Sequence, residues 1–189
     1  MKKTTGIIIA IAAVVAVLAI AVFSSYNGLV EKNESVNDAQ AAVSTQLQRR
    51  ADLIPNFVST VKGYSEYEQS AYTAVTEART AVQKASSVAE QSAAAEQLDG
   101  AVSVWVNAVT EAYPDLKANT QYTALTDELA GTENRIATAR RDYNAAAKKY
   151  NVAIRKFPSH IVAGIFGFDK VDYFEADSSA SAVPNVSFD

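Results

Sequence analysis

The stretch that decides the fold runs from Thr120 to Phe157 and reads TQYTALTDELAGTENRIATARRDYNAAAKKYNVAIRKF. It holds no proline and one glycine, so we expect one helix of roughly 57 Å at ~1.5 Å rise per residue. Two rows of mostly apolar residues recur every seven positions, which is the heptad pattern of a helix that packs against other helices. The first row is Tyr122, Leu129, Ile136, Tyr143, Tyr150 and Phe157, and the second is Leu125, Thr132, Ala139, Ala146 and Ala153.

A second heptad pattern precedes this one in the chain and predicts its partner helix. Because the heptad phase survives across Pro55, we expect a kink there and not a reversal of the chain. If Tyr26 lies opposite Phe157 in an antiparallel pair, facing residues have numbers that sum to about 183, which places Arg50 opposite Glu133. The rows of this helix are Leu29, Val36, Val43, Arg50, Phe57 and Tyr64, with Leu47, Ile54 and Val61.

The N-terminus begins with Lys2 and Lys3 and continues as an apolar run over residues 6–23. A run of about 20 apolar residues crosses a hydrocarbon core of ~30 Å, so we expect a transmembrane anchor over residues 1–25 with the lipid bilayer as its partner. A cleaved signal peptide, with Ala19-Ile20-Ala21 before the cut, and a prepilin-like leader are the alternatives. Nothing between Phe23 and Val30 stops a helix, which predicts a near-continuous helix from about Thr5 to Lys62.

Two shorter helices are expected between the long ones, which makes residues 26–157 an antiparallel up-down four-helix bundle. Turns are predicted at Gly63 and at Ser86-Ser87, and Ser65 with Glu68 forms a capping-box pattern. Pro114 ends the third helix, which begins near Val88, and Asn119 or Thr120 caps the last. The apolar stripes are Ala71, Val75, Ala78, Val82 and Ala85, and then Ala95, Leu98, Val102, Trp105, Val109 and Ala112.

The last part of the chain, residues 158–189, changes character after Pro158. Residues up to Phe168 are largely apolar, and the end of the last bundle helix should return them to the level of the membrane surface. The membrane-proximal side chains are Ile161, Ile165, Phe166 and Phe168. The tail from Asp169 has too few apolar residues to fold alone, so we expect it to be mostly irregular.

Composition argues against most kinds of chemistry. The 17 Lys and Arg against 21 Asp and Glu give a net charge of −4, without a basic field for nucleic acid. The absence of cysteine excludes disulfides and thiol nucleophiles. His160 is the single histidine, and no HExxH, phosphate-binding glycine loop or GxSxG occurs. We therefore expect no enzyme activity, no metal and no cofactor.

Two polar clusters stand out on the long helices. They read either as surface salt bridges worth ~0–1 kcal/mol each, or as a polar layer inside the bundle that sets register. Arg50 occupies a seam position, which favours burial. The candidate members of a structural polar layer are Arg49, Arg50, Asp52, Glu133, Asn134 and Arg140.

Several ordered blocks of this chain resemble the LemA family of bacterial membrane proteins. The blocks include residues 26–30, 46–56, 113–119, 132–144 and 173–176. One departure is Gln40, where the family pattern usually carries Trp. The resemblance implies a helical bundle behind an N-terminal membrane segment and does little to define the chemistry.

Together these features predict an interaction or scaffolding module of the bacterial cell envelope, with unidentified envelope proteins as partners. A self-assembling rod or filament subunit, which would form homo-oligomers, and an enzyme of unrecognised type are the alternatives. Because Lys2 and Lys3 precede the span and only Lys32 closely follows it, the domain is expected outside a single-pass inner-membrane anchor.

Overall fold

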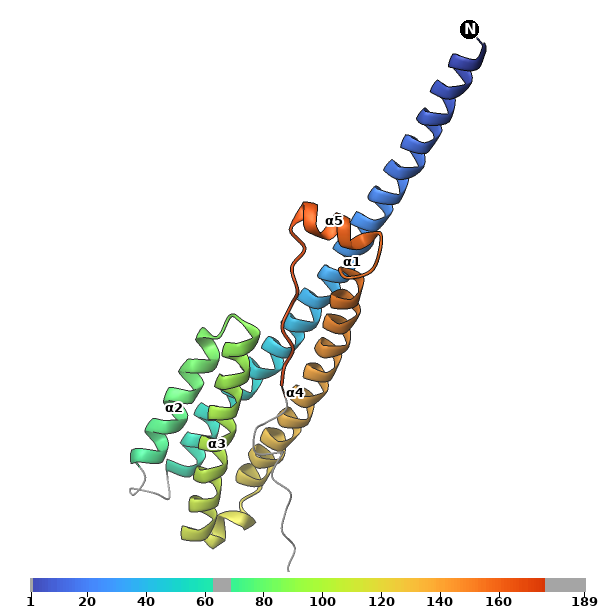
Figure 1. Ribbon diagram of the computed structural model, residues 1–189. Coiled ribbons are helices and arrows are strands. Elements are labelled where there is room, and N and C mark those ends of the chain that lie inside the picture. The colour runs from blue at the N-terminus through green and yellow to red at the C-terminus, as the bar shows by residue number, and fades with distance from the viewer. Residues whose placement is uncertain (1, 63–68, 176–189) are drawn as a thin grey trace, which may run out of the picture.

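The computed structural model describes residues 2–62 and 69–175, which form helices joined by short connections (Figure 1). No strand occurs within these two ranges. The predicted all-α fold is therefore confirmed. The elements are α1 (Lys2–Lys62), α2 (Gln69–Lys84), α3 (Val88–Ala112), the 3₁₀ helix η1 (Pro114–Ala118), α4 (Thr120–Ala153) and α5 (Ser159–Phe166).

One helix of 61 residues, α1, runs without a break from the apolar N-terminal stretch into the bundle. The predicted continuity across residues 24–28 is confirmed. Gly28 is the weakest helix former there, and one glycine costs a helix only ~1 kcal/mol. Pro55 also lies inside α1, so the chain does not reverse there, as expected. Proline removes a hydrogen bond and crowds the preceding turn. Burial of Ile54 and Phe57 on either side offsets that cost.

The N-terminal part of α1 extends beyond the other helices as a lone rod (Figure 1). Its large apolar side chains are exposed, with Ile7 at 59% and Phe23 at 69%. The helix is long and apolar enough to cross a membrane, and its most apolar window has no buried residue. No described part of the protein covers this surface, so α1 is not the core helix of a soluble bundle in this region.

The bundle is built on the antiparallel pair of α1 and α4, which make the most extensive contact in the molecule. The predicted seams are confirmed along most of their length, because their large residues are buried. The small second row of α4 is half-buried except for Thr132, which is fully buried. The buried seam residues are Leu29, Val36, Val43, Arg50 and Phe57 on α1, and Tyr122, Leu129, Ile136, Tyr143 and Tyr150 on α4.

Phe157 is the exception, and its assignment to the seam is wrong. Its side chain is 84% exposed, because α4 ends at Ala153 and the chain turns before Pro158. A residue that precedes proline is disfavoured in the helical region. The heptad pattern in the sequence therefore continues for one more seam residue, Phe157, after the helix has ended at Ala153.

The hairpin of α2 and α3 packs beside the half of α1 that lies farther from the N-terminus (Figure 1). The predicted turn at Ser86-Ser87 is confirmed, and Gln40 marks its level on α1 by donating to the Ser86 carbonyl at 3.2 Å. Four helices therefore lie side by side over only part of the length of α1. The predicted stripe residues Val75, Ala78, Val82, Ala95, Leu98, Val102, Trp105 and Val109 are buried, whereas Ala112 is exposed at the end of α3.

Local capping explains where the bundle helices begin. Ser87 and Glu90 form a capping box at the start of α3, which satisfies free N–H groups of the first turn. The capping box predicted at Ser65 and Glu68, for the preceding helix, lies outside the described ranges. At the start of α4 the predicted cap is confirmed, because the Asn119 side chain accepts from the N–H groups of Gln121 and Tyr122.

The C-terminal segment contains a helix that the sequence did not predict. α5 lies across α1 close to the end of α4 (Figure 1) and ends at Gly167, whose φ of 73° is left-handed. That conformation suits glycine and lets the chain turn back. Residues 169–175, called the strap below, then run irregularly along α4, as expected for the start of the tail.

Candidate functional site

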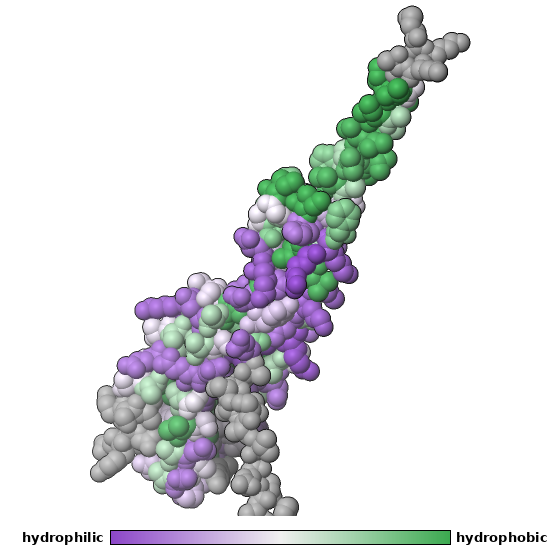
Figure 2. All heavy atoms as spheres, in the orientation of Figure 1, coloured by the Kyte–Doolittle hydropathy of each residue, from purple (hydrophilic) through white to green (hydrophobic). Residues whose placement is uncertain are grey.

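An apolar surface lies where the bundle meets the exposed part of α1. The inner face of α5 is buried through Val162 and Ala163, whereas its outer side chains are exposed. Figure 2 shows this green surface close to the apolar rod of α1. We call the exposed set the apolar foot: Phe157 at 84%, Ile161 at 55%, Ile165 at 70% and Phe166 at 53% exposed.

Aromatic contacts fix the height of the foot relative to α1. The ring of Tyr26 lies 4.8 Å from that of Phe166 and 5.6 Å from that of Phe168, both edge-on. Tyr26 follows the apolar run by three residues. Of the four membrane-proximal residues named from sequence, Ile161, Ile165 and Phe166 are exposed on α5, and Phe168 is half-buried against Tyr26.

The strap is held to α4 by two asparagine side chains that each bond both main-chain groups of one strap residue. Asn144 donates to the Phe174 carbonyl at 2.8 Å and accepts from its N–H at 2.9 Å. Asn151 makes the same pair with Val171, at 2.8 Å and 3.0 Å. These bonds satisfy the N–H and C=O groups of Val171 and Phe174, which have no neighbouring strand to pair with.

One side chain of the strap enters the protein. Phe174 is 4% exposed, packs edge-on against Tyr143 at 5.0 Å and lies 5.5 Å below the Arg140 guanidinium. The Tyr143 hydroxyl donates to the Asp172 carbonyl at 2.9 Å. Burial, with smaller contributions from Asp172 and Tyr173, raises the pKa of Tyr143, so the hydroxyl stays protonated and remains a donor.

Sequence analysis missed the strap because its contacts come from polar residues. Asn144 and Asn151 lie seven positions apart on α4 and border the predicted seam. Two asparagines at heptad spacing beside a seam are the signal that was available. Nothing in the pattern, however, indicates that the irregular tail is the segment that they bind.

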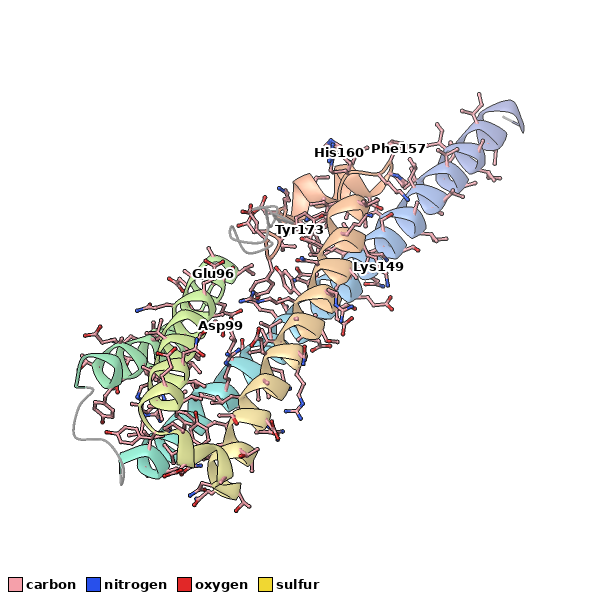
Figure 3. The ribbon with its side chains drawn as sticks, turned by 90° about the horizontal axis from the view of Figure 1, so that it is seen from below. Glu96, Asp99, Lys149, Phe157, His160 and Tyr173 are labelled. Atoms are coloured by element: carbon pink, nitrogen blue, oxygen red, sulfur yellow. The ribbon has the colours of Figure 1, made fainter. Side chains whose placement is uncertain are left out.

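Of the polar-layer residues named from sequence, only Arg50 is buried. Arg50 is 3% exposed and lies 2.7 Å from the Asp99 carboxylate and 3.7 Å from that of Glu133. The Asp99 contact is close but is not aligned as a hydrogen bond, and Nε of Arg50 has no acceptor. Asp99 is labelled on α3 in Figure 3, and it was not among the residues named from sequence.

The other polar-layer residues lie apart from Arg50. Arg49 is exposed and bonds Glu128 at 2.8 Å, and Asp52 accepts from Gln48 at 2.9 Å. Asn134 is exposed. Arg140 belongs to the strap site through its contact with Phe174. The structure therefore brings together Arg50 and Glu133, with Asp99 added, places Arg140 in the strap site, and leaves Arg49, Asp52 and Asn134 on the surface.

The described residues offer no assembled metal centre. Within residues 2–62 and 69–175, no group of three or more His, Asp or Glu side chains is placed to hold a metal ion. His160 is exposed at the start of α5 (Figure 3). A groove of about 760 Å³ beside α1 is lined mainly by amide, hydroxyl and apolar side chains, with Arg49 and Asp52. In this groove, Gln91 is buried and donates to the Ser44 hydroxyl at 2.8 Å.

Comparison with known proteins gives one family. The LemA family model matches residues 39–188. Magnetosome protein MamQ 2 of Paramagnetospirillum magneticum is 29% identical over 193 residues, covering 89% of this chain and 71% of that protein. Protein LemA of Metamycoplasma hominis is 26% identical over 155 residues, covering 79% of this chain and 68% of that protein. Because the family model matches most of its length, this chain belongs to the LemA family.

Proposed function

We propose that this protein is a single-pass, membrane-anchored interaction module of the bacterial cell envelope. The observation that carries the proposal is the continuity of α1, which joins an exposed apolar stretch to the bundle core in one helix of 61 residues. A rigid connection holds the bundle at a fixed height and angle to the bilayer. Such a device suits contact with neighbouring proteins more than turnover of a diffusing substrate.

The apolar foot supports the same proposal. Its four side chains are exposed, and its Phe166 packs against Tyr26, just beyond the apolar run. Arg155 and Lys156 are exposed immediately before the foot and fit the anionic headgroups of a cytoplasmic-membrane lipid. The foot would rest on the bilayer and keep α1 from tilting freely.

The names of the relatives give no reaction that could be carried over to this chain. The relatives are named for the magnetosome or for the family, and not for a reaction. The LemA family thus supplies the fold and leaves the activity to be measured.

Proximity labelling in native membranes tests the interaction role. A labelling enzyme fused to the full chain should mark a reproducible set of envelope proteins that an unrelated single-pass protein carrying the same enzyme does not mark. Identical labelling by the two fusions would contradict the proposal.

Two further measurements test anchoring and orientation. Resistance to carbonate extraction and an intact mass that includes residues 1–21 would distinguish an anchor from a cleaved signal peptide. Because the chain has no cysteine, a single Gln83→Cys substitution on the exposed surface of α2 gives a clean probe. A membrane-impermeant maleimide should label it in intact spheroplasts if the bundle lies outside.

A further inference from the structure

The strap site recognises main chain more than side chains. Both asparagine pairs bond the N–H and C=O of a strap residue, and every residue except proline supplies these two groups. Tyr143 adds a third bond to a main-chain carbonyl. Phe174 is the one deeply buried side chain of the strap.

The spacing of the asparagines selects an extended polypeptide. Seven residues along α4 from Asn144 to Asn151 correspond to ~10.5 Å at the helical rise. Three residues along the strap from Val171 to Phe174 correspond to roughly 10 Å in extended backbone. A helical ligand would advance only ~4.5 Å over three residues and would miss one asparagine. The structure therefore assigns to α4 a binding site for an extended segment with an aromatic anchor.

We propose that this site also accepts the strap of a second copy, so that neighbouring copies in one membrane are joined by exchanged straps. The proposal rests on the membrane anchoring proposed above. Copies anchored in the same bilayer hold their Asn144 and Asn151 at the same height and their straps in the same direction. A neighbour's strap then makes every bond that the chain's own strap makes, as in other domain exchanges.

The connection to the strap is long enough for exchange. Fifteen residues, 154–168, separate α4 from the strap. With α5 kept helical they span roughly 35 Å, against ~8–10 Å between packed helices. Gly167, with its left-handed φ, provides a pivot directly before Phe168.

Release of the strap breaks five hydrogen bonds to α4 and uncovers Phe174. A neighbour's strap restores each of these contacts, so an exchanged pair of copies keeps the same bonds as two separate copies. Tethering on a membrane raises the effective concentration of neighbouring straps. Exchange should therefore increase with the density of copies in the bilayer.

Photo-cross-linking of the full chain in proteoliposomes tests this inference. Phe174→p-benzoylphenylalanine places the reactive ketone beside Tyr143 and Arg140. Equal amounts of unlabelled and ¹⁵N-labelled protein are mixed before reconstitution. Peptides cross-linked between the strap and α4 are then sorted by mass into same-isotope and mixed-isotope pairs.

We expect mixed-isotope pairs between position 174 and residues near 140–143, at a share that rises with protein density. Tyr72→p-benzoylphenylalanine on α2, an exposed aromatic position at 44%, measures random collision. Tyr173→p-benzoylphenylalanine leaves Phe174 in place and should also give mixed-isotope pairs between the strap and α4. Adding Asn144→Ala and Asn151→Ala should reduce them to the Tyr72 level.

Two outcomes would overturn the inference. Cross-links to α4 that come only from within one copy at every density would make the strap strictly intramolecular. Mixed pairs unaffected by loss of both asparagines would assign the contact to another surface. Flotation of the same samples keeps the tests apart, because protein that does not float refutes anchoring, whereas protein that floats without mixed pairs refutes strap exchange alone.

Discussion

The guanidinium of Arg50 lies 2.7 Å from the carboxylate of Asp99, so a buried side chain of α1 is paired with a residue of α3. The same guanidinium is 3.7 Å from Glu133 on α4. One cation thus links the α1–α4 pair to the α2–α3 hairpin. Its side chain is 4% exposed, whereas those of Asp99 and Glu133 are 42% and 63% exposed.

This asymmetry of burial predicts unequal effects of substitution. Asp99→Asn removes the close partner of a buried cation and should lower the free energy of unfolding by ~1–3 kcal/mol. Glu133→Gln should cost less than ~1 kcal/mol, because its carboxylate is exposed and more distant. Arg50→Met should be nearly neutral or stabilising, since the two carboxylates left behind stay solvated.

Urea unfolding followed by circular dichroism measures these differences. Arg50→Met combined with Asp99→Asn should recover most of the loss caused by Asp99→Asn. Arg49→Met, with its exposed side chain, is the matched control. If the losses of the combined substitutions simply add, the two side chains are not coupled.

The Arg50 site illustrates which contacts the sequence could predict. Regular heptads on α1 and α4 fix their antiparallel register, so facing numbers that sum to 183 were enough to place Arg50 opposite Glu133. The contact between Arg50 and Asp99 could not be predicted, because the position of the hairpin along α1 depends on the turn at Ser86-Ser87 and its bond to Gln40. Neither feature has a heptad signature.

The C-terminal segment was harder to predict for a different physical reason. α5 has only eight residues and too short a pattern to separate a helix from an apolar loop. The strap is held by asparagine side chains and a tyrosine hydroxyl. Such bonds leave no apolar periodicity in the sequence.

Loss of Asn151 should release the strap at one end. The side chain is 5% exposed, and Asn151→Ala leaves the N–H and C=O of Val171 without their partners. We expect a loss of ~1–3 kcal/mol in local or global stability. Hydrogen exchange should show faster exchange of the Val171 amide. Asn134→Ala, at an exposed position of the same helix, should leave that amide protected, and equal rates in the two variants would contradict the bonding described.

The capping box of α3 predicts a pH dependence. Hydrogen bonds from the backbone N–H of Ser87, then from that of Ser86, and then from both hydroxyls lower the pKa of Glu90 from 4.5 to about 2. Because the folded pKa lies below the ordinary value, the cap contributes fully above pH 4.5. Its contribution is lost as the pH falls from that value toward about 2.

Thermal unfolding between pH 6 and pH 2 checks the cap. Glu90→Gln should remove part of the decline in melting temperature over the acidic range, because the glutamine does not titrate there. Glu96→Gln, an exposed position on the same helix, controls for the loss of one carboxylate. A decline that is the same in both variants would show that Glu90 is not responsible for it.

The foot predicts that a reporter on α5 meets lipid, whereas one on the hairpin does not. Ile165, at 70% exposed, and Val104, at 65% exposed on α3, are matched apolar positions at opposite ends of the bundle.

Trp105 is the single tryptophan, and replacing it by Phe keeps an aromatic ring against Phe57. In that background, Ile165→Trp should be quenched by lipids that carry a doxyl group near the headgroup, and less by lipids labelled near the chain end, because the proposed function places α5 at the interface. Val104→Trp should be quenched by neither. Equal quenching of the two reporters would mean that α5 faces water, and the foot would then be a surface for another protein.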